Sequence, residues 1–329
     1  MYAVDSPATP RQQRSSGGHQ RLPQRGAVKP KRRKNDSART PLLLATPALL
    51  ILAALLGYPM FRMVQLSFQD MRLRQLLTGV TPPWVGLDNY TNVLTDGFFW
   101  EVVRRTATFT VVSVVLSVVF GLAIALLMRR VARPVRLAMV IAMMFVWAVP
   151  QLVQAQIFKW MVDTDFGVFN YLLTQIGLDF QGHSWFADPT QGWIVITTLV
   201  IWAGIPFLAI TLNAGLTQVP KELLEAAVVD GASPWQALRK ITLPILKPLL
   251  TIVTTLSVIW NFGLFTQVWV LRDSKVEPEY QTLGTYSFIQ AFGQSKYSLG
   301  SAIAVITVLL MLGVTVFYIR QMFKIGEVD

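Results

Sequence analysis

Three long apolar stretches contain uncharged polar and aromatic side chains that could together bind a neutral sugar. Aromatic faces pack against the C–H surface of a sugar ring, and side-chain amides can donate to or accept from its hydroxyls. Inside a lipid bilayer such polar groups are costly unless they face a partner or a cavity, so they are functional candidates. They are Trp147, Gln151 and Gln154 in the first stretch, Trp202, Gly204, Phe207 and Asn213 in the second, and Trp260, Asn261, Gln267 and Trp269 in the third.

The same residue types also suit ordinary helix packing. Small and amide residues form contacts between membrane helices, and tryptophan is common at the membrane interface. Trp185, Trp193 and Trp269 fit interfacial anchors or contacts for an external binding protein better than a site within the membrane. Both interpretations are open from the sequence.

A charged segment, residues 220–244, lies between two apolar stretches and predicts two short helices joined by a turn. Pro220 suits the first position of a helix, and Gly231 suits the left-handed residue that ends it. Residues 233–236 have the form of a capping box, so the second helix should begin there. Pro244 lacks an N–H group, and we expect it to separate this second helix from the apolar stretch that follows.

The composition is that of a membrane protein. The chain has 329 residues, of which 53% are hydrophobic and 14% charged, whereas soluble domains are about 25% charged. With no cysteine and two histidines, we expect no metal site. The sequence has no P-loop, nucleophile elbow or zinc-protease motif, so we expect no catalytic residue and no cofactor on this chain, and any ATP hydrolysis on a separate subunit.

Six stretches are long and apolar enough to span a membrane, which takes roughly 20 helical residues. All must be helices, because an open strand in lipid leaves its backbone unpaired. Pro150 should open the third helix, and Pro206, close to Gly204, should kink or open the fourth. The spans are expected near residues 42–61, 106–128, 137–158, 193–216, 249–271 and 301–319.

Charge sets the expected orientation and the domain boundary. Residues 1–40 carry ten Lys or Arg and two Asp, and this basic arm should be disordered because it has few large apolar residues. We expect residues 41–329 to form the membrane domain. Lys and Arg gather in the arm, the 220–244 segment and the tail, whereas the connection from 161 to 191 has none. Both termini and the charged segment are therefore expected on the cytoplasmic side of a bacterial plasma membrane.

The charged segment resembles the EAA loop of the membrane subunits of ABC importers. Glu225-Ala226-Ala227, three residues, Gly231, then nine residues and Ile241-Thr242-Leu243-Pro244 match every position of that pattern. A plain amphipathic hairpin would explain the caps but not the full pattern. In the family this loop is the cytoplasmic coupling helix that docks on the ATP-hydrolysing subunit. The resemblance implies that the docking residues are Glu225, Ala226, Ala227, Asp230, Gly231, Ile241, Leu243 and Pro244.

Further segments resemble carbohydrate permeases of the maltose and glycerol-phosphate type. Residues 84–90 are similar to a segment of their first outer loop. The chain departs from the family at the start of the second span, where Arg105 precedes Thr106 at a position that is often Asn. The Trp-x-Gly-x-Pro-aromatic segment resembles one that contacts sugar, and Asn261 falls in the family's other contacting helix. Trp147 and the amides of the third and fifth spans are added to these residues. The candidate substrate site therefore consists of Trp202, Ala203, Gly204, Phe207, Asn261, Trp147, Gln151 and Gln267.

The resemblance implies an all-α membrane protein with six transmembrane helices and the type I ABC importer permease fold. The implied function is import of a disaccharide or short oligosaccharide, N,N′-diacetylchitobiose being one candidate. The implied partners are a second permease subunit, two ATPases carrying ATP and Mg, an extracytoplasmic solute-binding protein and the lipid bilayer. We expect no nucleic acid partner.

Three alternatives remain. One is an ion-coupled secondary carrier, which the absence of Asp, Glu, Lys and Arg from the central parts of the spans disfavours. Another is an ABC permease for a non-sugar solute such as glycerol 3-phosphate. The third is a membrane scaffold that uses the basic arm to bind anionic lipid or nucleic acid.

Overall fold

The computed structural model describes residues 39–326, which form α-helices with short π and 3-10 turns and no β-strand in that range. This confirms the predicted all-α class. The predicted basic arm lies almost entirely outside the described residues. The chain divides into two compact units between Leu55 and Leu56, and each unit is considered separately.

The first unit contributes an apolar helical segment. α1 (Arg39–Leu52) includes Pro47 and is followed by the π turn η1 (Ala53–Gly57). A helix from Leu44 to Ser67 is long and apolar enough to cross a membrane. It overlaps the first predicted span.

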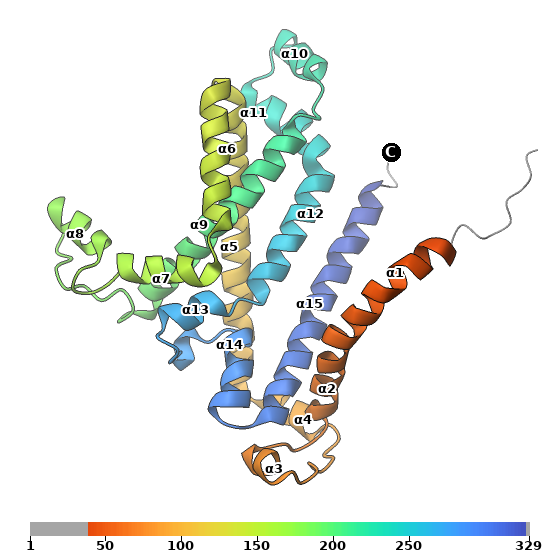
Figure 1. Cartoon of the computed structure of the whole chain (residues 1–329). Coiled ribbons are helices and arrows are strands. Elements are labelled where there is room, and N and C mark those ends of the chain that lie inside the picture. Colours follow the sequence, from red (N-terminus) through yellow and green to blue (C-terminus); the bar gives the residue numbers. More distant parts are fainter. Residues whose placement is uncertain (1–38, 327–329) are drawn as a thin grey trace, which may run out of the picture. The chain divides into compact units, whose positions relative to one another are not determined.

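The second unit holds the remaining helices (Figure 1). They are α2 (Tyr58–Ser67), α3 (Leu73–Thr78), α4 (Asp88–Thr95), α5 (Gly97–Arg130), α6 (Arg133–Ala148), α7 (Gln151–Met161), α8 (Val168–Gln175), α9 (Pro189–Leu216), α10 (Lys221–Val229), α11 (Pro234–Ala237), α12 (Leu243–Phe262), α13 (Thr266–Leu271), α14 (Leu283–Phe288) and α15 (Tyr297–Gly326). Three short turns complete it: the π turns η2 (Leu238–Thr242) and η4 (Ile289–Gly293), and the 3-10 turn η3 (Pro278–Tyr280).

Small residues bring α5 and α9 into close contact along much of their length. A Cβ atom added to Gly121 would lie 2.6 Å from the Cβ of Leu208, so this crossing requires glycine. Thr106, Ser113 and Ser117 on the same face of α5 are also buried. Small side chains allow helix backbones to approach each other in a membrane, and here they build the centre of the second unit.

The described residues contain five long helices that could span a membrane, or six spans if the bent pair α6 and α7 counts as one. These two helices meet at an angle of 97°. α6 ends at Ala148, and Pro150 is the N-cap of α7. The opening predicted at Pro150 is therefore confirmed, but the third stretch is not one straight helix.

The fourth and fifth spans differ from the predictions in where they break. The sequence predicts a kink or an opening at Pro206; α9 runs as one helix through this residue, so the opening is wrong. Pro206 is buried, and packed membrane helices tolerate a single missing hydrogen bond. The fifth span, expected to reach residue 271, instead ends at Phe262, and a non-helical linker from Gly263 separates it from α13. Hydropathy missed this break because the apolar sequence continues across it.

The charged segment forms the expected hairpin, except at its last proline. Gly231 has φ +77°, which confirms the left-handed residue after α10. Ser233 and Gln236 form the predicted capping box. The separation expected at Pro244 is wrong, because helix continues from Pro234 through η2 into α12. The wider π turn directly before α12 lets the proline ring follow without breaking the helix.

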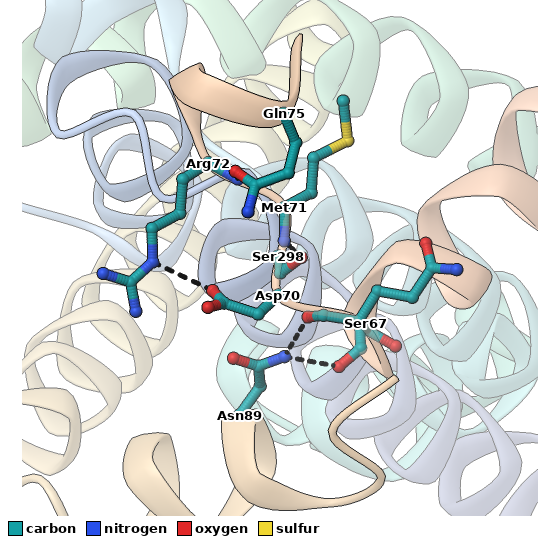
Figure 2. Close-up of polar contacts among 8 residues, drawn as sticks. Ser67, Asp70, Met71, Arg72, Gln75, Asn89 and Ser298 are labelled. Atoms are coloured by element: carbon teal, nitrogen blue, oxygen red, sulfur yellow. Dashed lines mark hydrogen bonds and ion pairs between the residues drawn. The ribbon is translucent and has the colours of Figure 1, made fainter. Parts of the chain in front are cut away.

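A polar cluster ties the chain after α2 to α4 and to the beginning of α15 (Figure 2). The Asn89 amide donates to the carbonyl oxygens of Ser67, at 2.9 Å, and Gln69, at 2.8 Å. The Met71 N–H donates to the Ser298 hydroxyl at 2.8 Å. Asn89 belongs to the 84–90 segment that resembles carbohydrate permeases, and its two bonds hold α4 to the chain after α2.

Candidate functional site

A cavity of about 460 Å³ lies where the α6–α7 bend and the α12–α13 break face α9. Its walls combine four amide side chains with three large aromatic ones, and none of its lining residues is charged. The amides are Gln151, Gln154, Asn261 and Gln267, and the aromatic residues are Trp147, Phe207 and Trp260.

Seven of the eight candidate substrate residues line this one cavity, although they come from three separate spans. They are Trp147, Gln151, Ala203, Gly204, Phe207, Asn261 and Gln267. Gln154 and Trp260, which were also noted in the sequence, join them.

Trp202 is the exception. It does not line the cavity, and its ring packs against Phe158 with 5.5 Å between centroids. A helix places consecutive side chains about 100° apart, so a single Trp-x-Gly-x-Pro-aromatic segment cannot aim all its members at one site. Asn213 and Trp269 also lie outside the lining, Trp269 being stacked on Phe265 at 5.3 Å.

The aromatic walls offer flat apolar faces. Phe207 and Trp260 meet edge to face, with ring centroids 5.1 Å apart and planes at 66°. Trp147 and Trp260 each keep more than half of their surface exposed, at 59% and 54%. Their faces are therefore free within this chain to cover an apolar surface of a ligand.

The amides differ in how much of their hydrogen-bonding capacity is already used. Asn261 donates to the Ser257 carbonyl at 2.7 Å. Gln267 is 5% exposed, and its amide has no hydrogen-bond partner among the described residues. Gln151 is exposed, and its side chain likewise makes no hydrogen bond within the described part of the chain. The cavity thus keeps both donors and acceptors for a polar, uncharged ligand.

The second break is held in place from outside the cavity. The Thr282 hydroxyl donates to the Leu264 carbonyl at 2.9 Å, and Thr282 is fully buried. Leu283 N–H in turn donates to the Thr106 hydroxyl on α5 at 3.0 Å. These contacts fix the linker between Asn261 and Gln267, so the two amides have a defined spacing.

A larger groove of about 680 Å³ lies elsewhere, between residues 104–116 of α5 and 189–201 of α9. Its charged lining residues are Arg104, Arg105 and Glu279, the others are apolar or threonine, and none is a candidate substrate residue. Arg105 donates to the carbonyl oxygens of Pro278, at 2.7 Å, and Gln281, at 3.1 Å. Arg105, which stands where the carbohydrate permeases often have Asn, therefore stabilises a loop.

The hairpin of α10 and α11 lies at the opposite end of the second unit from α3 and α4 (Figure 1). Of the eight residues that the resemblance assigns to docking, Glu225, Ala226, Asp230, Gly231 and Pro244 are exposed. Ala227 is buried, and Ile241 and Leu243 are half-buried.

The hairpin also exposes large apolar residues at positions that the EAA pattern leaves unspecified. Val228, Val229 and Trp235 are 71%, 86% and 65% exposed. Exposed apolar groups clustered among charged ones are typical of a surface that another protein covers. The sequence contains an indication of this apolar surface, because two of the three residues between Ala227 and Gly231 are valines, Val228 and Val229, and the third is Asp230.

Titratable groups with shifted pKa values lie in the loops around α13 and α14. Arg272 donates from Nε to Glu277 at 2.8 Å, and this hydrogen bond lowers the pKa of Glu277. The Arg272 guanidinium also lies over the rings of Phe186 and Tyr280, at 4.7 and 4.6 Å. Burial next to Asp96 raises the pKa of Tyr286 to about 12. These groups stabilise loops and do not face the cavity.

Nothing in the described part of the chain suggests a resident metal, because no group of three His, Asp or Glu side chains lies close enough to hold one.

Comparison with known proteins gives consistent results. The family described as "binding-protein-dependent transport system inner membrane component" matches residues 97–323. The chain is 37% identical over 303 residues to the diacetylchitobiose uptake system permease protein DasB of Streptomyces coelicolor, with 92% of each chain covered. It is 33% identical over 240 residues to the trehalose/maltose transport system permease protein MalF of Thermococcus litoralis, covering 72% of this chain and 79% of that relative.

Among solved structures, a chain of a bacterial ABC transporter involved in the import of the acidic polysaccharide alginate has the same fold. The TM-score is 0.73, and the match covers 88% of this chain and 97% of that chain. The sequence identity is 21%, so this likeness concerns the fold.

Proposed function

The chain belongs to the family of binding-protein-dependent transport system inner membrane components, and from this premise we propose that it imports a neutral disaccharide or short oligosaccharide as one permease subunit of an ATP-driven transporter. It is a multi-pass membrane transport protein and not an enzyme. Its curated relatives carry names of sugar uptake systems, for diacetylchitobiose in one case and for trehalose and maltose in another.

The observation that carries this proposal is the convergence of amides and aromatic rings on one uncharged cavity. Residues from α6, α7, α9, α12 and α13 meet there, although the first and last of them, Trp147 and Gln267, are more than 100 positions apart in the sequence. Trp147 and Trp260 line this cavity and keep more than half of their surface exposed, so their rings are open to a sugar.

In this proposal each part of the chain has a defined task. Trp147, Phe207 and Trp260 cover the apolar faces of the sugar, and Gln151, Asn261 and Gln267 pair with its hydroxyls. The absence of charge in the lining suits a neutral sugar and disfavours a phosphate-bearing solute such as glycerol 3-phosphate. Unpaired charge buried in a membrane cavity without a counter-ion is costly.

The hairpin of α10 and α11 is the proposed contact with a separate ATPase. Exposed Glu225 and Asp230 provide charge, and exposed Val228, Val229 and Trp235 provide an apolar surface. ATP and Mg would be bound by that partner, in two copies, while a second permease subunit and an extracytoplasmic binding protein complete the transporter. Closure of the ATPases would push the hairpin, and the helix from Pro234 to Phe262 links it directly to the cavity.

The distribution of Lys and Arg supports a cytoplasmic position for the hairpin and for both termini. Arg129, Arg130, Arg133 and Arg136 gather where α5 meets α6, whereas residues 161–191 lack Lys and Arg. Positive residues are retained on the cytoplasmic side of bacterial membranes. This placement puts the hairpin in the compartment that contains ATP.

Uptake by cells that carry cavity variants tests the proposal. Radiolabelled N,N′-diacetylchitobiose, trehalose and maltose are offered to cells with the native chain, with Trp147→Ala or with Trp160→Ala as a matched control. Trp160 is 54% exposed but does not line the cavity. We expect uptake of at least one of these sugars, a KM raised about tenfold by Trp147→Ala, equivalent to about 1.4 kcal/mol, and no change for Trp160→Ala. Equal effects of the two variants would contradict the assignment of the cavity.

A further inference from the structure

We infer that Gln154 has two linked roles: its amide nitrogen holds the α6–α7 bend, and its amide oxygen accepts a hydrogen bond from one donor group of the bound sugar. This inference rests on the proposed function and adds a positioning and specificity-determining residue to it.

The bend leaves backbone carbonyl groups without their usual helical donors. Pro150 has no N–H group, and α6 ends two residues before it. The Gln154 amide nitrogen donates to the carbonyl oxygens of Val146 and Val149, each at 3.1 Å. One side chain from the first turn of α7 thereby pairs with two carbonyl groups at the end of α6, and these two bonds bridge the 97° bend.

These bonds determine which way the amide faces. Both acceptors are carbonyl oxygens, so the NH2 group must point at them, and the reverse orientation would bring three oxygen atoms together. Both hydrogens of Nε2 are consequently used. Gln154 can offer only its oxygen to anything else.

That oxygen is buried and has no partner within the described part of the chain. Gln154 is 3% exposed, and its Oε1 accepts no hydrogen bond there. The residue lines the cavity beside Gln151. A buried acceptor without a partner is rare in a folded protein and needs an explanation. A hydroxyl or N–H group of the sugar provides the missing donor, whereas an anionic group would be repelled.

The two roles are coupled because they use the same rigid carboxamide. A donor bound to Oε1 polarises the amide and strengthens its N–H bonds to Val146 and Val149. A sugar in the cavity therefore stabilises the bend, and a change in the bend moves the acceptor away from the sugar.

Gln151 provides the contrast needed for a test. It lines the same cavity from the same turn of α7, yet it is exposed and makes no bond to α6. Gln151→Leu should raise the KM for sugar without changing the bend. Gln154→Met, which keeps the length and loses both the donors and the acceptor, should change both.

The experiment uses the assembled transporter in lipid nanodiscs. Because the chain contains no cysteine, spin labels can be placed at Leu137→Cys on α6 and Trp160→Cys on α7, both exposed. Pulsed EPR then reports the distance across the bend with and without whichever of N,N′-diacetylchitobiose, trehalose and maltose the native chain imports. We expect one narrow distance for the native residue and for Gln151→Leu, and a broadened distribution for Gln154→Met.

Deoxy analogues of the same sugar test whether the Gln154 oxygen accepts a hydrogen bond from the sugar. If Gln154 had only a structural role, its substitution would not change the discrimination between the sugar and its analogues. For the native chain, removal of one particular hydroxyl or N–H group should raise the KM at least tenfold. Gln154→Met should lose this discrimination and take up parent and analogue alike. A narrow distance in Gln154→Met, or unchanged discrimination, would overturn the inference.

If Gln154→Met does not accumulate in the membrane, uptake of the deoxy analogues by the native chain is the remaining test of the inference. A series in which no single donor group matters would then overturn the inference. Failure of the proposed function looks different, because then none of the three sugars is imported or Trp147→Ala leaves uptake unchanged.

Discussion

Substitution of Gly231 separates the shape of the hairpin from its contact with a partner. Gly231 has φ +77°, and a Cβ atom added there would meet no heavy atom within 4 Å. The turn is closed by backbone bonds, from Gly231 N–H to Val228 at 3.0 Å and from Ala232 N–H to Ala227 at 2.8 Å. Within this chain a side chain at position 231 therefore has space, and its only cost is the left-handed backbone.

That backbone cost can be ranked. Alanine in the left-handed region costs about 1–2 kcal/mol, whereas asparagine and aspartate adopt it more readily. A loss of this size lowers the ratio of formed to unformed turn about 5–30-fold. If only the shape of the hairpin mattered, Gly231→Asn would transport nearly as well as the native chain and better than Gly231→Ala.

We expect a different order, because the proposed ATPase covers Gly231 closely. Gly231→Asn should lose most sugar uptake although its backbone cost is small, and Gly231→Asp, with added charge, should abolish uptake. The amount of each variant in the membrane, measured by immunoblot, should equal that of the native chain. Normal uptake by Gly231→Asp, or uptake that follows the backbone ranking alone, would refute docking at this turn.

Three further predictions concern the helices and loops that position the cavity. Gly121→Ala should destabilise the α5–α9 crossing by about 1–3 kcal/mol through overpacking, which lowers the midpoint of thermal unfolding in detergent. Gly313→Ala is the control, because a Cβ atom added there meets no atom within 4 Å. Equal midpoints for the two variants would count against close packing at Gly121. Thr282→Val should lower the midpoint by removing a buried hydrogen bond, about 1–3 kcal/mol, and raise the KM for sugar; an unchanged KM would show that the Leu264 linker needs no such support. The Arg272 bond lowers the pKa of Glu277, so its stabilisation is complete above the ordinary glutamate pKa and is lost as pH falls through the lowered value. The midpoint of the native chain should therefore drop more than that of Glu277→Gln between about pH 6 and pH 3, and parallel curves would contradict this role.

Much of the cavity could be predicted from the sequence because its chemistry depends on residue type. Amides and tryptophans within apolar stretches are few, so residue type alone indicates Trp147, Gln151, Asn261 and Gln267 as candidates. The capping box and the left-handed conformation of Gly231 could also be predicted, since these motifs depend on neighbouring residues alone.

The helix breaks could not be placed with the same success because they depend on distant contacts. Pro150 opens a helix, whereas Pro206 and Pro244 do not, although each lacks the same N–H group. Pro206 is packed within the second unit, and Pro244 follows a π turn that accommodates its ring. The break after Phe262 is held by the Thr282 hydroxyl, which lies 18 positions beyond the Leu264 carbonyl that it binds.

The misplacement of Trp202 has a related cause. A family motif marks a segment, but the rotation of the helix decides which of its side chains faces the cavity. Ala203, Gly204 and Phe207 share the face that does so, and Trp202 packs on Phe158 instead.

The most direct test of the central claim is transport in a defined system. Vesicles are prepared with this chain and its sister permease, with the ATPase and the sugar-binding protein either present or left out, and labelled sugar inside is measured over time. We predict that sugar accumulates against its gradient only when ATP, the ATPase and the binding protein are all present, and that Gly231→Asp stops it. Accumulation without the ATPase would contradict the account.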